Sequence, residues 1–200
     1  MKKTAKNICG QSNKFRLLVS FYLIIIFLSK ISAQNDAFTK LRESVIGISL
    51  IDERLPEGYN YNPIFFTARW LIYEFSSERK GSFRIVAEPQ FVINWAPEGF
   101  ENNIEFGTNF GIQYFYRLTN QNALGFSISA GPHYHNLSTA IQAKGFIFSD
   151  NFELGYYQKW GRDWGVTVKT RFRHLSNAGL KSPNIGIDNF FLMLGIFWDK

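Results

Sequence analysis

The stretch IEFGTNFGIQYFYRL, residues 104–118, changes character at every step along the chain. One set of alternate positions is apolar or aromatic apart from one threonine: Ile104, Phe106, Thr108, Phe110, Ile112, Tyr114, Tyr116 and Leu118. The positions between them are mostly small or polar: Glu105, Gly107, Asn109, Gly111, Gln113, Phe115 and Arg117. Successive side chains of a β-strand point to opposite faces, so this period predicts a strand with one apolar face. The run is far longer than the usual strand of roughly 5–6 residues, and its aromatic alternation is typical of a strand whose outer face meets lipid.

The same alternation recurs along the chain. It is clean in residues 83–95 and 124–134, where the second face is again small or polar, as inside a narrow barrel. Five further segments alternate less regularly: Ser44–Ile51, Ile64–Phe75, Phe146–Lys159, Trp164–His174 and Asn189–Trp198. One irregularity is Asp150, which shares a face with Phe148 and Phe152. The eight segments predict an all-β fold, an eight-stranded antiparallel transmembrane β-barrel.

Charged residues fall on the polar face of these strands. Glu88, Glu105 and Glu153 are expected to point inward, as are Arg171 and Arg173. A buried charge needs a partner, so we expect an ionic network in the lumen. The cations considered as partners of the carboxylates are Arg84, Arg117, Lys159, Lys169 and Arg171.

The links between the predicted strands alternate in length. Those near residues 52–62, 96–103, 135–144 and 175–187 are long, and those near 76–81, 119–122 and 160–163 are short. Outer-membrane barrels have short periplasmic turns and longer external loops. With the N-terminus in the periplasm, the last long link is therefore external.

The first 33 residues have the anatomy of a secretory signal peptide. The segment from Leu17 to Leu28 is apolar, and Ser32-Ala33 offers a small-residue cleavage site. The region before it is basic, through Lys2, Lys3, Lys6, Lys14 and Arg16. The alternative is a membrane anchor, but a spanning helix needs roughly 20 apolar residues. We therefore expect a signal peptide over residues 1–33, a barrel over 34–200, and integration in the outer membrane of a bacterial cell after cleavage.

Removal of this leader changes the charge balance. Six of the 22 Lys and Arg residues precede Gln34 and no acidic residue does, which leaves 16 basic against 16 acidic residues. The high isoelectric point thus belongs to the leader, and nucleic acid is not an expected partner. The single cysteine, Cys9, leaves as well, so the mature chain can form neither a disulfide nor a cysteine metal site.

A candidate for chemistry lies in residues 174–188, HLSNAGLKSPNIGID. His174 and Ser176 share one face of a strand, the one that carries Phe172 and is expected to meet lipid. A serine nucleophile needs a base, and the base needs an orienting acid. Asp188 follows across a loop and would return beside His174 if the flanking strands pair. The alternative is a loop with ordinary turn chemistry, because His-x-Ser is common by chance.

Two other histidines share a face, His133 and His135. Two ligands are too few for a metal site, and neither histidine has an evident third partner. A hydrogen-bonding role at the rim or in the lumen is the better interpretation. The sequence predicts neither a metal nor a cofactor.

Residues 174–179, His-Leu-Ser-Asn-Ala-Gly, followed by Pro183-Asn184-x-Gly186 near the end of an eight-stranded barrel, resemble the lipid A 3-O-deacylase (acyloxyacyl hydrolase-related) outer-membrane family. The resemblance implies a serine esterase that removes the 3-O-linked hydroxyacyl chain from lipid A, so lipopolysaccharide would be the substrate. It implies Ser176 as nucleophile and His174 as general base, with Asn184 and the Gly179 backbone N–H as oxyanion donors and Asn177 as a neighbour within the motif. The family's acid is typically a glutamate twelve residues after the serine, and this chain has Asp188 there.

Two other functions stay open at this point. One is a non-enzymatic small outer-membrane barrel, structural or adhesive. The other is a soluble lipocalin-like binder, whose narrow interior would have to hold a ligand. A homodimer is also left open as an assembly of the chain.

Overall fold

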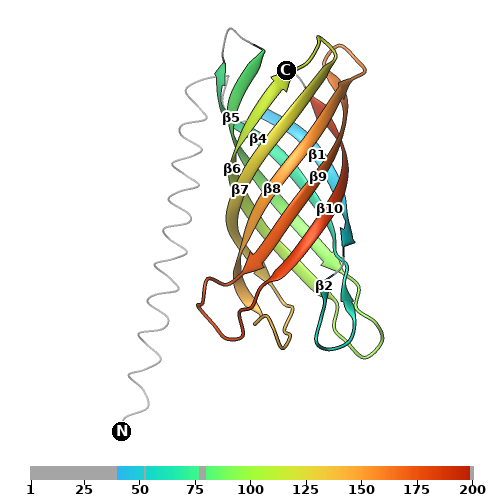
Figure 1. Cartoon of the computed structure of the whole chain (residues 1–200), viewed down its shortest axis with the longest axis vertical. Coiled ribbons are helices and arrows are strands. Elements are labelled where there is room, and N and C mark those ends of the chain that lie inside the picture. The colour runs from blue at the N-terminus through green and yellow to red at the C-terminus, as the bar shows by residue number, and fades with distance from the viewer. Residues whose placement is uncertain (1–39, 52, 77–79, 199–200) are drawn as a thin grey trace. The chain divides into compact units, whose positions relative to one another are not determined.

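The computed structural model describes residues 40–51, 53–76 and 80–198, so the expected signal peptide lies outside the described residues. Eight long strands form a closed barrel in the order β1-β10-β9-β8-β7-β6-β5-β4, and each is antiparallel to both neighbours (Figure 1). The strands are β1 (Lys40–Ile51), β4 (Ile64–Ser76), β5 (Gly81–Asn94), β6 (Asn103–Arg117), β7 (Asn122–His135), β8 (Gly145–Lys159), β9 (Trp164–Ser176) and β10 (Ile187–Trp198). No helix among the described residues is long and apolar enough to cross a membrane. The predicted fold class and the eight segments are confirmed.

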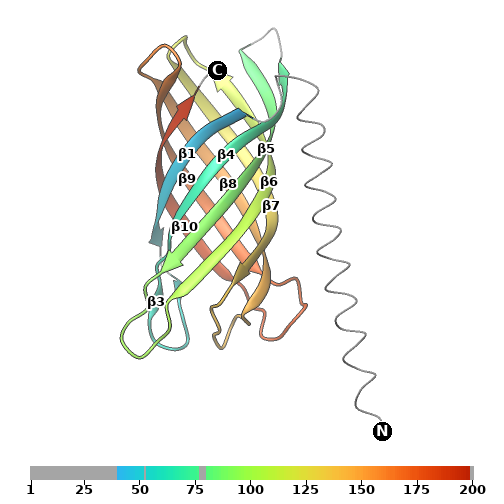
Figure 2. The same ribbon diagram turned by 180° about the vertical axis from the view of Figure 1, so that it is seen from behind.

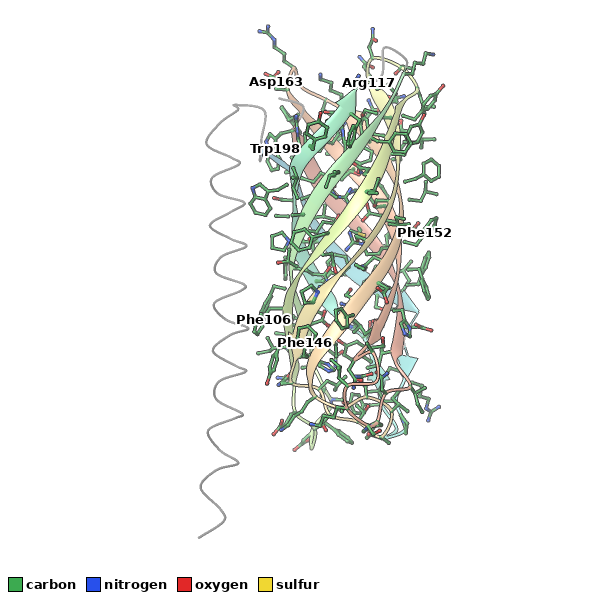
Figure 3. All side chains as sticks on the ribbon, turned by 90° about the vertical axis from the view of Figure 1, so that its left-hand side faces the viewer. Phe106, Arg117, Phe146, Phe152, Asp163 and Trp198 are labelled. Carbon is green, nitrogen blue, oxygen red and sulfur yellow. The ribbon has the colours of Figure 1, made fainter. Side chains whose placement is uncertain are left out.

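The outer wall of the barrel is apolar and aromatic. Phe106, Phe146 and Phe152 point away from the barrel (Figure 3), and more than half of the Phe106 and Phe152 side chains is exposed, at 58% and 54%. The opposite positions of β6 are buried, among them Glu105, Asn109 and Gln113. Because strand parity decides the face, the two sides predicted for residues 104–118 are the two sides observed.

The two ends of the barrel differ. The long connections gather at the lower end in Figure 1 and the short turns at the upper end, and the view from behind shows the same division (Figure 2). The first long connection contains a two-stranded sheet of β2 (Glu53–Arg54) and β3 (Asn60–Tyr61), which the sequence did not predict. It is too short to show a period.

Ion pairs cross the middle of the lumen. Glu153 accepts hydrogen bonds from Arg69, Lys169 and Arg171. Glu88 pairs with Arg69 and Arg171, and Glu43 pairs with Arg69 and Lys169. These six side chains are almost completely buried, and their charges offset one another.

The expected ionic network is thus present, with partial changes of partner. Arg84 pairs with Glu74, its register partner at the short-turn end, and not with Glu88, Glu105 or Glu153. Nearer the long loops, Glu105 bonds Arg173 and His133, and His133 also reaches Asn109. His135 bonds the carbonyl of Ala143. Both histidines therefore have hydrogen-bonding roles, and the described residues contain no cluster of three or more metal-ligating side chains.

An apolar cap closes the lumen near the long loops. Its seven buried residues come from the first and third long connections and from adjoining strand ends: Leu55, Tyr59, Tyr61, Leu137, Ile147, Leu175 and Ile187. Leu175 and Ile187 are partners in the β9–β10 register and are at most 1% exposed. They are also the inward-facing neighbours of the candidate residues on the outer face, so the cap anchors that end of the hairpin from inside.

Candidate active site

The hairpin of β9 and β10 brings His174 and Asp188 together. The two residues are direct partners in the antiparallel register, and Nδ1 of His174 lies 2.6 Å from Oδ1 of Asp188. Their side chains are 38% and 54% exposed on the outside of the barrel. A neutral imidazole that donates from Nδ1 to a carboxylate keeps the lone pair of Nε2 free to accept a proton.

Ser176 lies on the same outer face, two residues beyond His174 at the end of β9. One further step of the register places Gly186 across from it, since Leu175 pairs with Ile187. Gly186 has φ +99°, and a Cβ added there would lie 2.6 Å from Cε1 and 3.1 Å from Nε2 of His174. The imidazole thus occupies the space that any other residue at 186 would fill, and it extends from Asp188 toward the Ser176 end of the strand. Gly186 belongs to the sequence motif, which by itself predicts no role for it.

The loop after Ser176 is held by Asn177. Its carbonyl accepts from the Leu180 N–H at 3.0 Å across a turn whose central residues, Ala178 and Gly179, both have positive φ. Its side-chain amide donates to the carbonyl of Lys181 at 2.6 Å. Because Asn177 bonds through both its backbone carbonyl and its side-chain amide within five residues, this loop has a defined shape.

Asn184 is tied to the same residue. Its Oδ1 accepts a hydrogen bond from the backbone N–H of Asn177 at 2.6 Å. Because a side-chain amide has one carbonyl and one NH₂ group, this contact fixes which way the amide faces and directs its donors elsewhere. The residue that anchors this amide, Asn177, directly follows Ser176. An amide held there can donate an N–H to an oxyanion beside the serine.

Comparisons with known proteins identify the family of the chain. The model of the lipid A 3-O-deacylase (PagL) family matches residues 69–197. The chain belongs to this family. A search of curated proteins returned no significant match.

Among solved structures, a crystal structure of the outer-membrane enzyme PagL superposes with a TM-score of 0.59 at 15% identity, covering 76% of this chain and 97% of that one. This likeness supports the fold. The Yersinia pestis outer-membrane protein Ail, in a phospholipid bilayer nanodisc, gives a TM-score of 0.37 at 13% identity, with 78% and 99% of the two chains covered. As a member of the lipid A 3-O-deacylase family with a closed barrel, the chain is an outer-membrane β-barrel protein of a hydrolase family that acts on lipid A. The interpretation as a soluble binder is set aside.

Within this family's motif, the structure places the candidate residues unequally. His174, Asp188 and Gly186 are in contact, and Asn184 is fixed to Asn177. Gly179 is exposed in the turn at φ +75°, so its amide is the less constrained of the two expected donors. All of these residues come from one hairpin of one chain, and nothing in this arrangement requires a second copy.

One carboxylate near the site was left without a role by the sequence analysis. Asp150 on β8 is the register partner of His174 on its other side, so that His174 lies between Asp150 and Asp188 on the outer face. Asp150 is exposed among phenylalanines. A carboxylate on an apolar outer wall is costly, and its break in the alternation of residues 146–159 was the signal that could have found it.

Proposed function

We propose that this protein is a lipid A 3-O-deacylase that works through Ser176, His174 and Asp188 on the lipid-facing side of the barrel. The observation that supports this proposal best is the His174–Asp188 hydrogen bond on the outer face that Ser176 shares, in a chain of this family. A substrate that is itself a membrane lipid can reach such a face directly. The long-loop end would be the external one, where lipopolysaccharide forms the outer leaflet.

The proposed reaction begins at Ser176. Oγ of Ser176 attacks the carbonyl carbon of the 3-O-acyl ester while Nε2 of His174 takes the hydroxyl proton. Asp188 orients the imidazole and stabilises its protonated form. The charge on the carbonyl oxygen is stabilised by N–H groups of Asn184 and the Gly179 backbone. The C–O bond to the sugar then breaks, and the sugar oxygen takes the proton from His174.

Water completes the cycle. It gives a proton to His174 and attacks the carbonyl carbon of the acyl-Ser176 ester. The bond from that carbon to Oγ of Ser176 then breaks, Oγ takes the proton back from His174, and a 3-hydroxy fatty acid leaves. Each step moves one proton between Ser176, His174 and substrate, so neither a metal nor a cofactor is needed. The replacement of glutamate by Asp188 keeps the carboxylate, and the 2.6 Å contact supports its role despite the shorter side chain.

The test is a mass spectrum of lipid A from cells that express the wild-type chain or Ser176→Ala. Wild-type lipid A should lose the mass of one 3-hydroxyacyl chain, and the variant should leave lipid A intact while it folds and inserts normally. If Ser176→Ala removed as much fatty acid as wild type, the site assignment would be wrong. If neither protein changed lipid A at equal expression, the non-enzymatic barrel would become the better interpretation.

We also propose that residues 1–33 are removed on export. The mature protein should begin near Gln34, which N-terminal sequencing of outer-membrane fractions would show. A mature chain that retained the segment from Leu17 to Leu28 would instead be anchored by it.

A further inference from the structure

The connection between β7 and β8, residues 136–144, contributes none of the candidate catalytic residues, yet it pairs with the segment that carries Asn184. The Ile185 N–H donates to the carbonyl of Ile141 at 2.8 Å, and the Ala143 N–H donates to that of Pro183 at 2.9 Å. Gln142 and Asn184 face each other in the resulting antiparallel bridge. The backbone on both sides of Asn184 is therefore bound to another loop.

The β7–β8 connection is itself internally braced. The hydroxyl of Thr139 accepts from the N–H of Gln142 at 2.9 Å and of Ile141 at 3.3 Å. The Thr139 N–H donates to the carbonyl of Gln142 at 2.9 Å. Thr139 and Gln142 are both buried. One threonine side chain thus shapes the strip of backbone that faces Asn184.

The first long connection, between β1 and β4, adds to this support. The carboxylate of Glu57, between β2 and β3, accepts from the Ala140 N–H at 2.6 Å. Leu137 of the β7–β8 connection lies in the apolar cap with Leu175 and Ile187. The β7–β8 connection is therefore also held by the link between β2 and β3 and by the cap.

An oxyanion donor is effective only if it is held in place before the reaction begins. A misplacement of about 1 Å can cost about 100-fold in rate. The bond from Asn177 fixes the rotation of the Asn184 amide, but it cannot fix the backbone of a ten-residue loop. The bridge to Ile141–Ala143 supplies that constraint.

We propose that the β7–β8 connection positions the oxyanion hole, with Thr139 as the positioning residue that acts through Gln142 on Asn184. This inference rests on the proposed function, because it assigns a support to the donor of that reaction. Thr139 lies 37 positions before Ser176 and outside the catalytic hairpin, yet full activity would depend on it. It predicts that damage to Thr139 lowers the rate of the chemical step and leaves lipid A binding unchanged.

The test is a comparison of Thr139→Val with Thr139→Ser in purified, folded protein that hydrolyses lipid A in detergent micelles. Valine keeps the shape of threonine but removes the hydroxyl acceptor, whereas serine keeps it. We expect Thr139→Val to lower kcat about tenfold with KM within about twofold, and Thr139→Ser to retain most of the activity. Heat-modifiable gel mobility would verify that each barrel is folded.

A double-mutant cycle separates positioning from a general structural effect. The Asn184→Ala variant lacks the oxyanion amide. Adding Thr139→Val to this variant should therefore lower kcat by less than about a further twofold. Glu57→Ala, which removes the acceptor of the Ala140 N–H from a different connection, should show the same dependence with a smaller loss.

Three results would overturn the inference: a Thr139→Val enzyme as active as wild type, a loss confined to KM, or a full tenfold loss that persists in Asn184→Ala. Failure of the proposed function has a different signature, since Ser176→Ala would then be as active as wild type or the wild type would be inactive.

Discussion

Charged and polar side chains serve two regions of this barrel in opposite ways. In the lumen, Glu153 is buried and accepts hydrogen bonds from three cationic side chains. On the outer wall, Asp188 is half exposed and, among the contacts of the described residues, bonds His174 alone. The lumen groups use their hydrogen-bonding capacity on one another, which stabilises the fold. The outer pair leaves Nε2 of His174 available for a reaction.

The largest expected effect is the loss of activity when His174 of the outer His174–Asp188 pair is replaced. His174→Ala removes the general base, and we expect hydrolysis of lipid A to fall by about 10⁶-fold, as when a serine hydrolase loses its catalytic histidine. The barrel should fold normally, because the side chain packs into no core. Release of 3-hydroxy fatty acid from purified lipid A measures the rate. A His174→Ala protein that failed to fold would show that the pair is structural and would remove the contrast.

A substitution in the lumen should have the reverse effect: it should lower the stability of the barrel and leave the catalytic rate unchanged. Glu153→Ala leaves Arg69, Lys169 and Arg171 with too little negative charge around them, and loss of one member of a buried ionic cluster costs about 3–5 kcal/mol. Urea unfolding from liposomes, followed by gel mobility, measures the free energy. Molecules that remain folded should hydrolyse lipid A at a wild-type rate. Glu101→Gln, in an exposed connection, is the matched control and should change neither property.

A smaller effect is expected from crowding of the imidazole. Gly186→Ala places a Cβ against the His174 ring and strains a backbone at φ +99°. Displacement of the base by a fraction of an ångström to 1 Å should lower kcat about 100-fold. The Gly58→Ala variant, also at positive φ but with nothing within 4 Å, controls for backbone strain alone. Equal activity of the two variants would mean that the ring is not held as described.

The smallest effect is expected at Asp188. Asp188→Glu restores the residue that the family typically has, so activity should stay within about threefold of wild type or rise. Asp188→Asn is the comparison, because an amide cannot stabilise the imidazolium and should cost more, though less than His174→Ala. Both rates come from the same fatty-acid assay. A large loss in Asp188→Glu would show that the 2.6 Å contact depends on the shorter side chain.

Sequence reasoning was reliable where a property depends on neighbours along the chain. Alternation placed all eight barrel strands, to within about four residues at their ends, because successive residues of a strand point to opposite faces. The same rule set His174 and Ser176 on the outer face and Arg171 and Arg173 on the inner one. It also predicted that Asp188 would return to His174, because consecutive strands of a barrel pair antiparallel.

The amino-acid sequence by itself therefore determined the strands, the two faces, the long and short ends, and the candidate residues of one hairpin. The tertiary structure alone decided which lumen carboxylate meets which cation, as between Arg69 and Glu153, 84 positions apart. It alone brought residues 141–143 beside Asn184 and packed the cap beneath the site. The physical reason is the separation along the sequence of the residues involved. The face of a strand residue is set by its immediate neighbours, whereas contacts between loops depend on the path of the whole chain and cannot be predicted from a local pattern.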